Sequence, residues 1–414
     1  MTSLDGKLHV KHGYPFKSEY FSDAGKYIVL TPGNFYEEGG FKRQVGKEKF
    51  YQGDVPKDYL HSKGDLIVAM TEQSLGLLGS CAFVPDGDTY LHNQRLGLIT
   101  TDPEKLDVNF VYYLFQSKSV REQIRLTSTG SKVKHTSPER IYSVKVALPK
   151  VDEQKKIAAV LAALDAKIDC NNRINAELES MAGTIYGYWF VQFEFPDANG
   201  NPYKSSNGKM ASNAKLSRDI PDGWTGSSIL AVADLLGGGT PTKKKAEYWG
   251  GNIPFFTPTD ADGAIFKFST ADYITDEGLK DSSTRRFGKH TVFITARGSV
   301  GKLALAGVDM AMNQSCYALR AKPGISHTFL FFLAKELIHH LQVKSSGSVF
   351  DSIVSNDIEL TNLAIPTEDI IEKFAVVTEP LFERIANNIR ENQQLAQLRD
   401  WLLPMLMNGQ VTVA

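Results

Sequence analysis

Hydroxyl and basic side chains gather in a few short, glycine-containing stretches of this sequence. Ser128–His135 (STGSKVKH) combines small hydroxyls, a Gly and three further donors, and a shorter version, Ser345–Ser348 (SSGS), follows in the second half of the chain. Lys42–Lys49 (KRQVGKEK) and Thr240–Lys245 (TPTKKK) form two basic stretches. Such groups can donate to phosphate oxygens, and Arg, Lys, Asn and Gln can also pair with base edges. The chemistry of these stretches therefore favours contact with DNA.

These stretches, with the amide, hydroxyl and guanidinium groups near them, are the candidate DNA contacts. The alternative for any single basic residue is an ordinary solvated surface charge. That alternative weakens where basic loops recur at matching places in two parts of the chain. The full set of candidates is Asn34, Lys42, Arg43, Lys47, Thr71, Gln73, Ser131, Lys132, Lys134, His135, Thr240, Lys243, Lys244, Lys245, Thr259, Arg285, Arg286, Arg297, Ser346 and Ser348.

The stretches nearest to catalytic motifs each lack an essential residue. Arg297–Leu303 (RGSVGKL) approaches a phosphate-binding loop, but its first Gly is misplaced and Leu303 has no hydroxyl for Mg²⁺. Asn201–Tyr203 (NPY) lacks the second Pro that an amino-methyltransferase motif would need. His339 and His340 lie on a predicted helix without the spacing of a zinc protease, which favours a surface or packing role. We therefore expect no catalytic residue and no metal site in this chain.

The chain repeats itself, which indicates the elements that position the contact loops. Matches that recur in the same order, separated by loops of slightly different length, indicate an internal duplication. The matched pairs are Gly25–Pro32 with Gly251–Pro258, Gly64–Thr71 with Gly288–Thr295, Asn93–Gln94 with Asn313–Gln314, Ser128–Ser131 with Ser345–Ser348, and Leu148–Pro149 with Ile365–Pro366.

Each repeat ends in a Pro and a short acidic run, after which a long helical pattern begins. Acidic residues suit the first turn of a helix, and the apolar residues that follow have the spacing of a coiled coil. The same register sets Asn171 and Asn175 opposite Asn388 and Asn392, where seam polar groups would fix the pairing; the alternative is that they face solvent. The predicted seam and partner-contact positions are Ile157, Leu161, Leu164, Ile168, Asn171, Asn175, Leu178, Phe374, Leu381, Ile385, Asn388, Asn392 and Leu395.

Between the helices, the pattern is one of short β-rich runs punctuated by Gly and Pro. One helix per lobe is predicted, near Val108–Ile124 and His327–Val343. The fold class is therefore α+β: two mixed α/β lobes in a pseudo-twofold internal repeat, separated by long helices with coiled-coil spacing. The predicted segments are lobes at 1–150 and 216–366, helical regions at 151–190 and 367–414, and a Gly/Asn/Ser/Pro-rich linker at 191–215.

Charge and cysteine content restrict the setting without deciding the function. The net charge is −1 over 414 residues, but lobe 1–150 holds 20 basic against 17 acidic residues, whereas segment 367–414 holds 4 against 7. This modest asymmetry is consistent with lobes that touch DNA and helices that do not. Three scattered cysteines argue against disulfides and fit a reducing cytoplasm, and no apolar stretch is long enough to predict a membrane span.

The order of motifs resembles the specificity (S) subunit of type I restriction-modification enzymes over essentially the whole chain. The first lobe departs from the family pattern because it lacks the Pro-Asp-Gly-Trp entry of the second, so we expect another segment to complete its edge. The stretches that carry the resemblance are Gly13–Phe21, Phe195–Tyr203, Ile220–Trp224, Gly237–Pro241 with Tyr248–Trp249, the Pro149 and Pro366 junctions, and Trp401–Gly409.

The resemblance implies a division of labour between this chain and its partners. The lobes would be target recognition domains for the two halves of a bipartite double-stranded DNA site. The helices would form a long antiparallel coiled coil that holds the lobes apart and sets the spacer. Two methyltransferase (M) subunits would dock on the helices, and motor-nuclease (R) subunits would then join. S-adenosylmethionine, ATP and Mg²⁺ would belong to those partners, with no cofactor in this chain.

Two other interpretations stay open from the residues alone. One is a specificity module that serves a fused methyltransferase-nuclease. The other is a coiled-coil scaffold whose lobes bind protein or small ligands. DNA binding through several phosphates must weaken steeply with salt, which distinguishes the scaffold from both specificity proteins.

Overall fold

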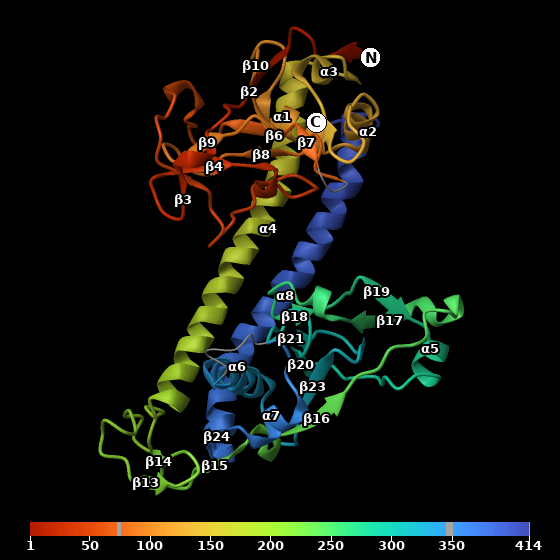
Figure 1. Cartoon of the computed structure of the whole chain (residues 1–414). Helices are drawn as coiled ribbons and strands as arrows, with labels where there is room; N and C mark the ends of the chain where they lie inside the picture. Colours follow the sequence, from red (N-terminus) through yellow and green to blue (C-terminus); the bar gives the residue numbers. More distant parts are fainter. Residues whose placement is uncertain (73–75, 345–350, 414) are drawn as a thin grey trace. The chain divides into compact units, whose positions relative to one another are not determined.

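The computed structural model describes residues 1–72, 76–344 and 351–413 of the chain. They form two compact units: unit 1 comprises Met1–Ile168 and Gln394–Ala414, and unit 2 comprises Asp169–Gln393 (Figure 1). The boundary falls inside both long helices, so each unit contains part of each. Among the described residues, no helix is long and apolar enough to cross a membrane.

Unit 1 is built around a four-stranded sheet in the order β2-β10-β6-β8. Alternate residues of a strand point to opposite faces, so Leu66 and Val68 pack with Phe110 of the helical layer while Ile67 packs with Leu30 of a second sheet. That sheet has the order β3-β5-β4-β9, with β4 and β9 parallel. The strands are β1 (Thr2–Ser3), β2 (Leu8–His12), β3 (Phe21–Ser22), β4 (Tyr27–Leu30), β5 (Phe50–Tyr51), β6 (Leu66–Ala69), β7 (Thr71–Glu72), β8 (Cys81–Phe83), β9 (Tyr90–His92), β10 (Leu96–Thr101), β11 (Lys134–His135) and β12 (Lys145–Val146).

The helical layer of unit 1 differs from the single helix predicted near Val108–Ile124. It consists of α1 (Val108–Gln116) and α2 (Lys118–Leu126), followed by the short α3 (Pro138–Tyr142). Ser117 separates α1 from α2 because its backbone is extended, with its hydroxyl donating to the carbonyl of Leu114 at 2.7 Å. A hydroxyl that competes with the backbone in this way favours a helix end.

Unit 2 repeats the same plan with longer strands. Its main sheet has the order β16-β23-β20-β21-β18, and a second sheet has the order β19-β17-β22 with β17 and β22 parallel. The helices are α5 (Asp276–Lys280), α6 (His327–Lys344) and α7 (Ser355–Leu360). The strands are β13 (Met210–Asn213), β14 (Arg218–Pro221), β15 (Thr225–Ser228), β16 (Ala233–Gly237), β17 (Trp249–Phe256), β18 (Phe266–Lys267), β19 (Asp272–Ile274), β20 (Val292–Thr295), β21 (Leu303–Ala306), β22 (Ala311–Met312), β23 (Cys316–Ala321) and β24 (Asn362–Ile365).

The strand orders confirm the internal repeat. The series β2-β10-β6-β8 of unit 1 corresponds to β16-β23-β20-β21 of unit 2, and in each unit the second sheet contains a parallel pair, β4 with β9 or β17 with β22. The small ladder β15-β24 of unit 2 corresponds to β1-β12 of unit 1. The N-terminal residues Thr2–Ser3 thus supply the edge that the missing entry motif left open.

The strand register corrects one alignment within the repeat. Sequence matching pairs Gly64–Thr71 with Gly288–Thr295, but the ladders place Ala69 opposite Leu96 in unit 1 and Thr295 opposite Cys316 in unit 2. The equivalence is therefore shifted by two residues, so that Gly64 corresponds to His290. Both residues have the left-handed backbone, with φ of 88° at Gly64 and 71° at His290. Aligning the two repeats on a shared Gly is therefore misleading here, because a His adopts the same backbone conformation in the second repeat.

The long helices are α4 (Val151–Tyr186), continued by a π-helical turn at Gly187–Val191, and α8 (Glu368–Met407). In unit 2 they run antiparallel: Asn171 Nδ2 donates to Asn392 Oδ1 at 2.9 Å, and Asn388 Nδ2 donates to Asn175 Oδ1 at 2.8 Å. Asn171 and Asn388 are fully buried, so these amides form the seam instead of facing solvent.

The predicted seam positions fall into two classes. Ile157 and Leu161 join the core of unit 1 with Leu403 and Leu406, and Phe374 and Ile385 join the core of unit 2. The N-terminal half of each helix therefore completes the core of a lobe. In α8 it is Phe382, rather than the predicted Leu381, that is fully buried, because this turn packs on Phe331 and Phe332 of α6. The remaining predicted apolar positions, Leu164, Ile168, Leu178, Leu381 and Leu395, are half-buried.

The linker predicted at 191–215 is a packed part of unit 2 at both ends. Phe193 and Phe195 are buried against Trp224, with ring centroids 5.4 and 5.3 Å from it. Residues 210–213 form β13, which pairs with β14. Turn-forming composition indicated the exposed middle of this segment, but the two aromatic residues before it required a core that composition does not reveal.

Candidate nucleic-acid interface

Three loops meet at the same place in each unit, at the ends of the parallel strand pair. In unit 1, β4 and β9 end together, with Leu30 opposite His92, and in unit 2 β17 and β22 end with Phe256 opposite Met312. Four parts form what we call cradle 1 and cradle 2. They are the two loops that follow these strands, the loop after β2 or β16, and the second residue beyond the end of β6 or β20. Cradle 1 comprises Gly13–Tyr14, Thr31–Asn34, Thr71 and Asn93–Arg95; cradle 2 comprises Gly238–Gly239, Thr257–Asp260, Arg297 and Asn313–Ser315.

The first cradle loop is a capped Thr-Pro turn. Thr31 N donates to Asn34 Oδ1 at 2.9 Å in cradle 1, and Thr257 N donates to Asp260 Oδ2 at 2.8 Å in cradle 2. The Pro residue sets the backbone dihedral that such a turn needs at its start. Asn34, predicted as a DNA contact, is buried here, and its amide also donates to the carbonyl of Lys42 at 3.3 Å. Its hydrogen bonds shape the turn, so a direct base contact by Asn34 is not supported.

The second cradle loop is a tight turn held by an asparagine side chain. Asn93 Oδ1 accepts from Arg95 N at 3.0 Å, and Asn313 Oδ1 accepts from Ser315 N at 3.0 Å. An Asn that caps its own turn in this way needs no helix or sheet to hold the backbone. The residue at the tip, Gln94 or Gln314, is exposed.

A glycine brings the third loop against the second. A Cβ at Gly13 would lie 1.9 Å from the carbonyl oxygen of Asn93, and one at Gly238 would lie 2.2 Å from that of Asn313. No side chain fits at either distance, so these positions require glycine. Tyr14 N and Gly239 N then donate to His92 O and Met312 O, each at 3.0 Å. The same close approach is thus built in both units.

The fourth part of each cradle differs between the units. Thr71 is buried, with its hydroxyl 3.1 Å from Nδ1 of His135, and β7 pairs with β11 of the Ser128–His135 loop. Arg297 occupies the equivalent position and is exposed, with a backbone bridge to Ser352. The loop that sequence matching paired with Ser128–Ser131 includes Ser346 and Ser348, which lie outside the described residues, as does Gln73.

The other candidates of unit 1 are exposed or half-buried side chains. Arg43 pairs with Asp86 at 2.7 Å, and Lys42 lies 5.6 Å from the ring centre of Tyr36. Ser131, Lys132, His135 and Lys47 are exposed, and Lys134 is half-buried in β11.

In unit 2 the basic candidates divide between paired and available groups. Lys245 donates to Tyr248 at 2.6 Å, whose hydroxyl donates to Asp281, and Arg286 pairs with Asp276 at 3.0 Å. Lys243 lies over the ring of Trp249, and Lys244 and Arg285 are exposed. Thr240 donates its hydroxyl hydrogen to Gln314 at the tip of cradle 2, and Thr259 Oγ1 lies 2.7 Å from Thr257 Oγ1.

Cradle 1 borders a hollow of about 450 Å³. Its wall combines aromatic rings, hydroxyls, amides and positive charge. The lining residues are Phe16, Phe21, Val29, Thr31, Pro32, Gly33, Lys49, Thr71, Leu77, Asn93, Gln94 and Arg95. A surface of this composition can stack on a base and donate hydrogen bonds to its edge.

Below cradle 1, two histidines are buried side by side. The rings of His61 and His92 lie 4.7 Å apart, and His61 Nδ1 is 2.9 Å from Asp65 Oδ2. Burial, with a smaller contribution from the neighbouring His61, lowers the pKa of His92 to about 3. His92 is therefore neutral at neutral pH and adds no positive charge to the cradle.

Three exposed residues at the cradle tips are functional candidates that are absent from the set predicted from the sequence: Gln94, Arg95 and Gln314. The repeated Asn-Gln pair was visible in the sequence, but only as evidence of duplication. Because the Asn is spent on the turn, the exposed residues after it are the ones available for contact. The Asn-Gln pair recurs at matching places in both repeats and lies in a loop instead of a core strand. That recurrence could have identified these residues as candidates.

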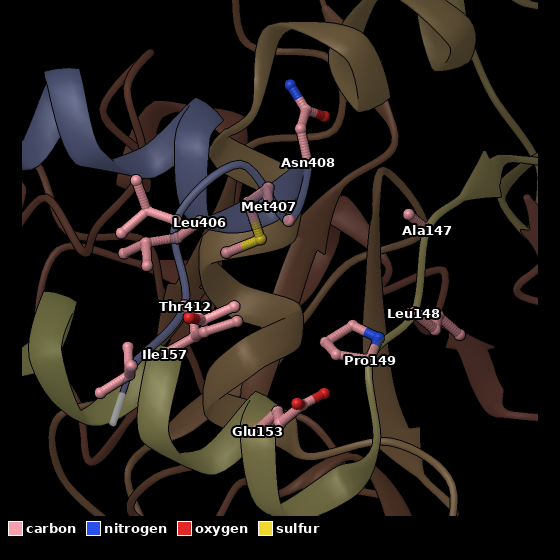
Figure 2. A pocket seen from close by; sticks show the side chains of 12 residues that line it. Ala147, Leu148, Pro149, Glu153, Ile157, Leu406, Met407, Asn408 and Thr412 are labelled. Carbon is pink, nitrogen blue, oxygen red and sulfur yellow. The ribbon is translucent and has the colours of Figure 1, made fainter.

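A second cavity in unit 1 has a different character. It measures about 250 Å³ and lies between the start of α4 and the end of α8, as Figure 2 shows. Leu406, Met407 and Ile157 point toward one another there, with Glu153 at its edge. Its lining is mainly apolar, and Asn408 is the one amide side chain among the residues that line it.

The near-motifs are structural. Arg297–Leu303 forms the turn between the antiparallel strands β20 and β21, whereas a phosphate loop connects a strand to a helix. Tyr203 stacks on Phe195 with ring centroids 4.5 Å apart. His340 lies on α6, 3.7 Å from Glu336.

Comparison with known proteins gives a consistent result. The family model described as type I restriction modification DNA specificity domain matches residues 3–180 and 221–397, one match for each repeat. The type I restriction enzyme MjaIX specificity subunit of Methanocaldococcus jannaschii is 26% identical over 308 residues, covering 73% of this chain and 69% of the relative. The HindI specificity subunit of Haemophilus influenzae is 21% identical, covering 79% and 82%. The crystal structure of a type I restriction-modification S subunit from M. genitalium has the same fold, with a TM-score of 0.58 and 15% identity over 98% of this chain and 95% of the other.

Proposed function

Because this chain belongs to the type I restriction-modification DNA specificity family, we propose that it directs a type I complex to a bipartite DNA site. Each unit recognises one half of that site through its cradle and the basic loops around it. The observation that carries the proposal is the duplicated cradle. Its hydrogen bonds and glycine approach recur in both units although most of the surrounding residues differ.

The proposal assigns catalysis to partners. Two methyltransferase subunits dock on the helix pair, and motor-nuclease subunits join them. S-adenosylmethionine, ATP and Mg²⁺ act on those partners, while this chain positions them on DNA. Support comes from the exposed basic and amide groups of the cradles, which can bind a nucleic acid. The proposed location is the cytoplasm, where DNA is accessible and the free cysteines Cys81, Cys170 and Cys316 stay reduced.

The decisive experiment measures binding and methylation by the chain assembled with its host's methyltransferase subunits. Methylated adenines, mapped on random DNA, are expected to define one site with two specified halves and an unspecified spacer. Affinity is expected to fall steeply with salt, by about 10³–10⁵-fold between 50 and 200 mM if six to ten phosphates are contacted. Weak salt dependence, or methylation without a bipartite preference, would contradict the proposal and favour a protein scaffold.

The role of the helices has its own test. Residues 169–175 of α4 and 388–394 of α8, which pair antiparallel, are removed together. We expect the spacer to shorten while both half-site sequences stay unchanged. The reason is that the length of the helix pair sets the distance between the two DNA segments that the lobes contact. An unchanged spacer would exclude the helices as the ruler.

A further inference from the structure

We infer that the tips of the two Asn-held turns recognise bases: Gln94 with Arg95 in unit 1, and Gln314 in unit 2. The inference rests on the proposed function and adds which side chains set the sequence preference of each lobe. It also predicts that the lobes differ at this point, because Ser315 stands where unit 1 has Arg95.

The backbone of each tip is fixed before DNA arrives. In unit 1, Asn93 accepts from Arg95 N, its own carbonyl accepts from Leu96 N at 2.9 Å, and the carbonyl of Arg95 accepts from Met70 N at 2.9 Å. In unit 2, the carbonyl of Ser315 accepts from Ala296 N at 2.8 Å. The turn is thus tied to the central sheet on one side and to the glycine loop on the other. Such preorganisation lowers the entropy cost of placing one side chain against one base.

The side chains at the tip of unit 1 suit a base edge. Arg95 is exposed and has no ion pair with any residue that the structure describes, so its guanidinium is available. It can donate two parallel hydrogen bonds to O6 and N7 of guanine, and the Gln94 amide can pair with N6 and N7 of adenine. Both line the hollow of cradle 1, together with Phe16 and Phe21.

The tip of unit 2 has a narrower choice. Gln314 Oε1 accepts from Thr240, which orients the amide and leaves Nε2 to donate. Ser315 cannot supply the two-pronged donor of Arg95. Recognition at this position of the second half-site therefore depends on Gln314. A guanine is expected opposite Arg95 in the first half-site, but it is not required at the matching position of the second.

The test compares variants of the chain assembled with the same methyltransferase subunits. Methylation rates are measured over DNA libraries randomised in each half-site. Arg95→Ala is expected to reduce discrimination at one base pair of one half-site by about 5- to 150-fold, the range for losing one two-pronged contact. Arg95→Lys keeps the charge and loses the planar fork, so it should lose part of that discrimination while the salt dependence stays unchanged. Gln314→Ala is expected to change the other half-site alone.

Arg125→Ala is the matched control, since Arg125 is an exposed arginine on α2 outside the cradle. It removes the same charge and should leave both half-site preferences intact. The inference is overturned if Arg95→Ala weakens methylation equally on all sequences, as a phosphate contact would, or if the thermally stable variants retain the parent's preference. If the parent complex has no bipartite preference, the proposed function itself fails. Matching thermal unfolding of parent and variants shows that the preference, and not the fold, has changed.

Discussion

The two units share a cradle but close their cores differently. In unit 2, Phe190 and Phe374 lie 5.0 Å apart, inside a cluster of rings that includes Phe193, Phe195 and Trp224. In unit 1 the residues in the same places, Met407 and Ile157, line the apolar cavity of about 250 Å³. The close-packed aromatic cluster and the open cavity stand at equivalent ends of the long helices.

This difference shows which positions of the duplicated fold tolerate substitution and which do not. The cradle depends on a few hydrogen bonds and a glycine contact with no spare space, so substitution there is severely limited. A core tolerates many combinations of apolar residues when its total volume is preserved. The lobes have therefore diverged in their cores and in their tip residues while keeping the loop geometry.

The largest expected effect contrasts the two cores. Phe374→Ala removes a fully buried ring of unit 2 and should cost about 3–5 kcal/mol of unfolding free energy. Ile157→Ala enlarges an existing cavity in unit 1 and should cost nearer 2 kcal/mol, at the low end for a buried aliphatic residue. Urea denaturation followed by tryptophan fluorescence and circular dichroism measures both. If both variants lost the same unfolding free energy, the side chains around Ile157 would be packed as tightly as those around Phe374.

The next test concerns the shared glycine contact. Gly238→Ala should cost about 1–3 kcal/mol and disturb cradle 2, because the added carbon meets the carbonyl oxygen of Asn313. Gly237→Ala is the neighbouring control, since a Cβ there has no atom within 4 Å. Thermal unfolding and methylation of the second half-site are the measurements. If both variants behave alike, close approach does not shape the cradle.

Acid should weaken both units through different histidine pairs. Burial lowers the pKa of His92 in unit 1 to about 3 and that of His327 in unit 2 to about 4. Their ordinary pKa is near 6.5, so as pH falls the unfolded chain binds protons first. Stability therefore decreases from pH 6.5 down to about pH 3 for His92 and about pH 4 for His327. The loss from pH 7 to 5 is roughly 1–2 kcal/mol for each histidine.

Variants separate the two contributions. His92→Phe should reduce the acid sensitivity of unit 1 and His327→Phe that of unit 2, as measured by urea midpoints at pH 7 and 5. His327 stacks on His290 with centroids 3.9 Å apart, so a planar ring is the closest replacement. Unchanged pH dependence in both variants would show that other groups control acid unfolding.

The smallest effect contrasts the helix contacts of the two units. In unit 2, Asn175 and Asn388 should couple by about 0.5–1.5 kcal/mol in a double-mutant cycle to alanine. In unit 1, Arg399 Nη1 lies 2.9 Å from Asp165 Oδ1 in a partly exposed ion pair. Its coupling should decrease from low to high salt, whereas the amide coupling should not. The same salt response in both cycles would contradict this assignment.

The local sequence carried much of the architecture. Repeated motifs, proline junctions and apolar spacing indicated the duplication, both long helices and the asparagine seam. The sequence was misleading where the two repeats reach the same backbone conformation with different residues. His290 adopts the left-handed conformation of Gly64, and matching Gly64 to Gly288 therefore misaligned the repeats by two residues. The candidate site was only partly predictable, because residue type cannot distinguish Asn34, spent on its own turn, from the available Arg95.

By itself, the sequence therefore determined the features that are periodic or repeated, namely the length of the two long helices and the presence of two similar lobes. These depend on local spacing, which is written along the chain. Only the tertiary structure decided which polar groups remain available, because a hydrogen bond such as that from Thr31 to Asn34 consumes an acceptor without leaving a mark in composition. It also decided that Gln94 and Gln314 stand at matching tips, since that placement depends on strands and glycine contacts far apart in the sequence.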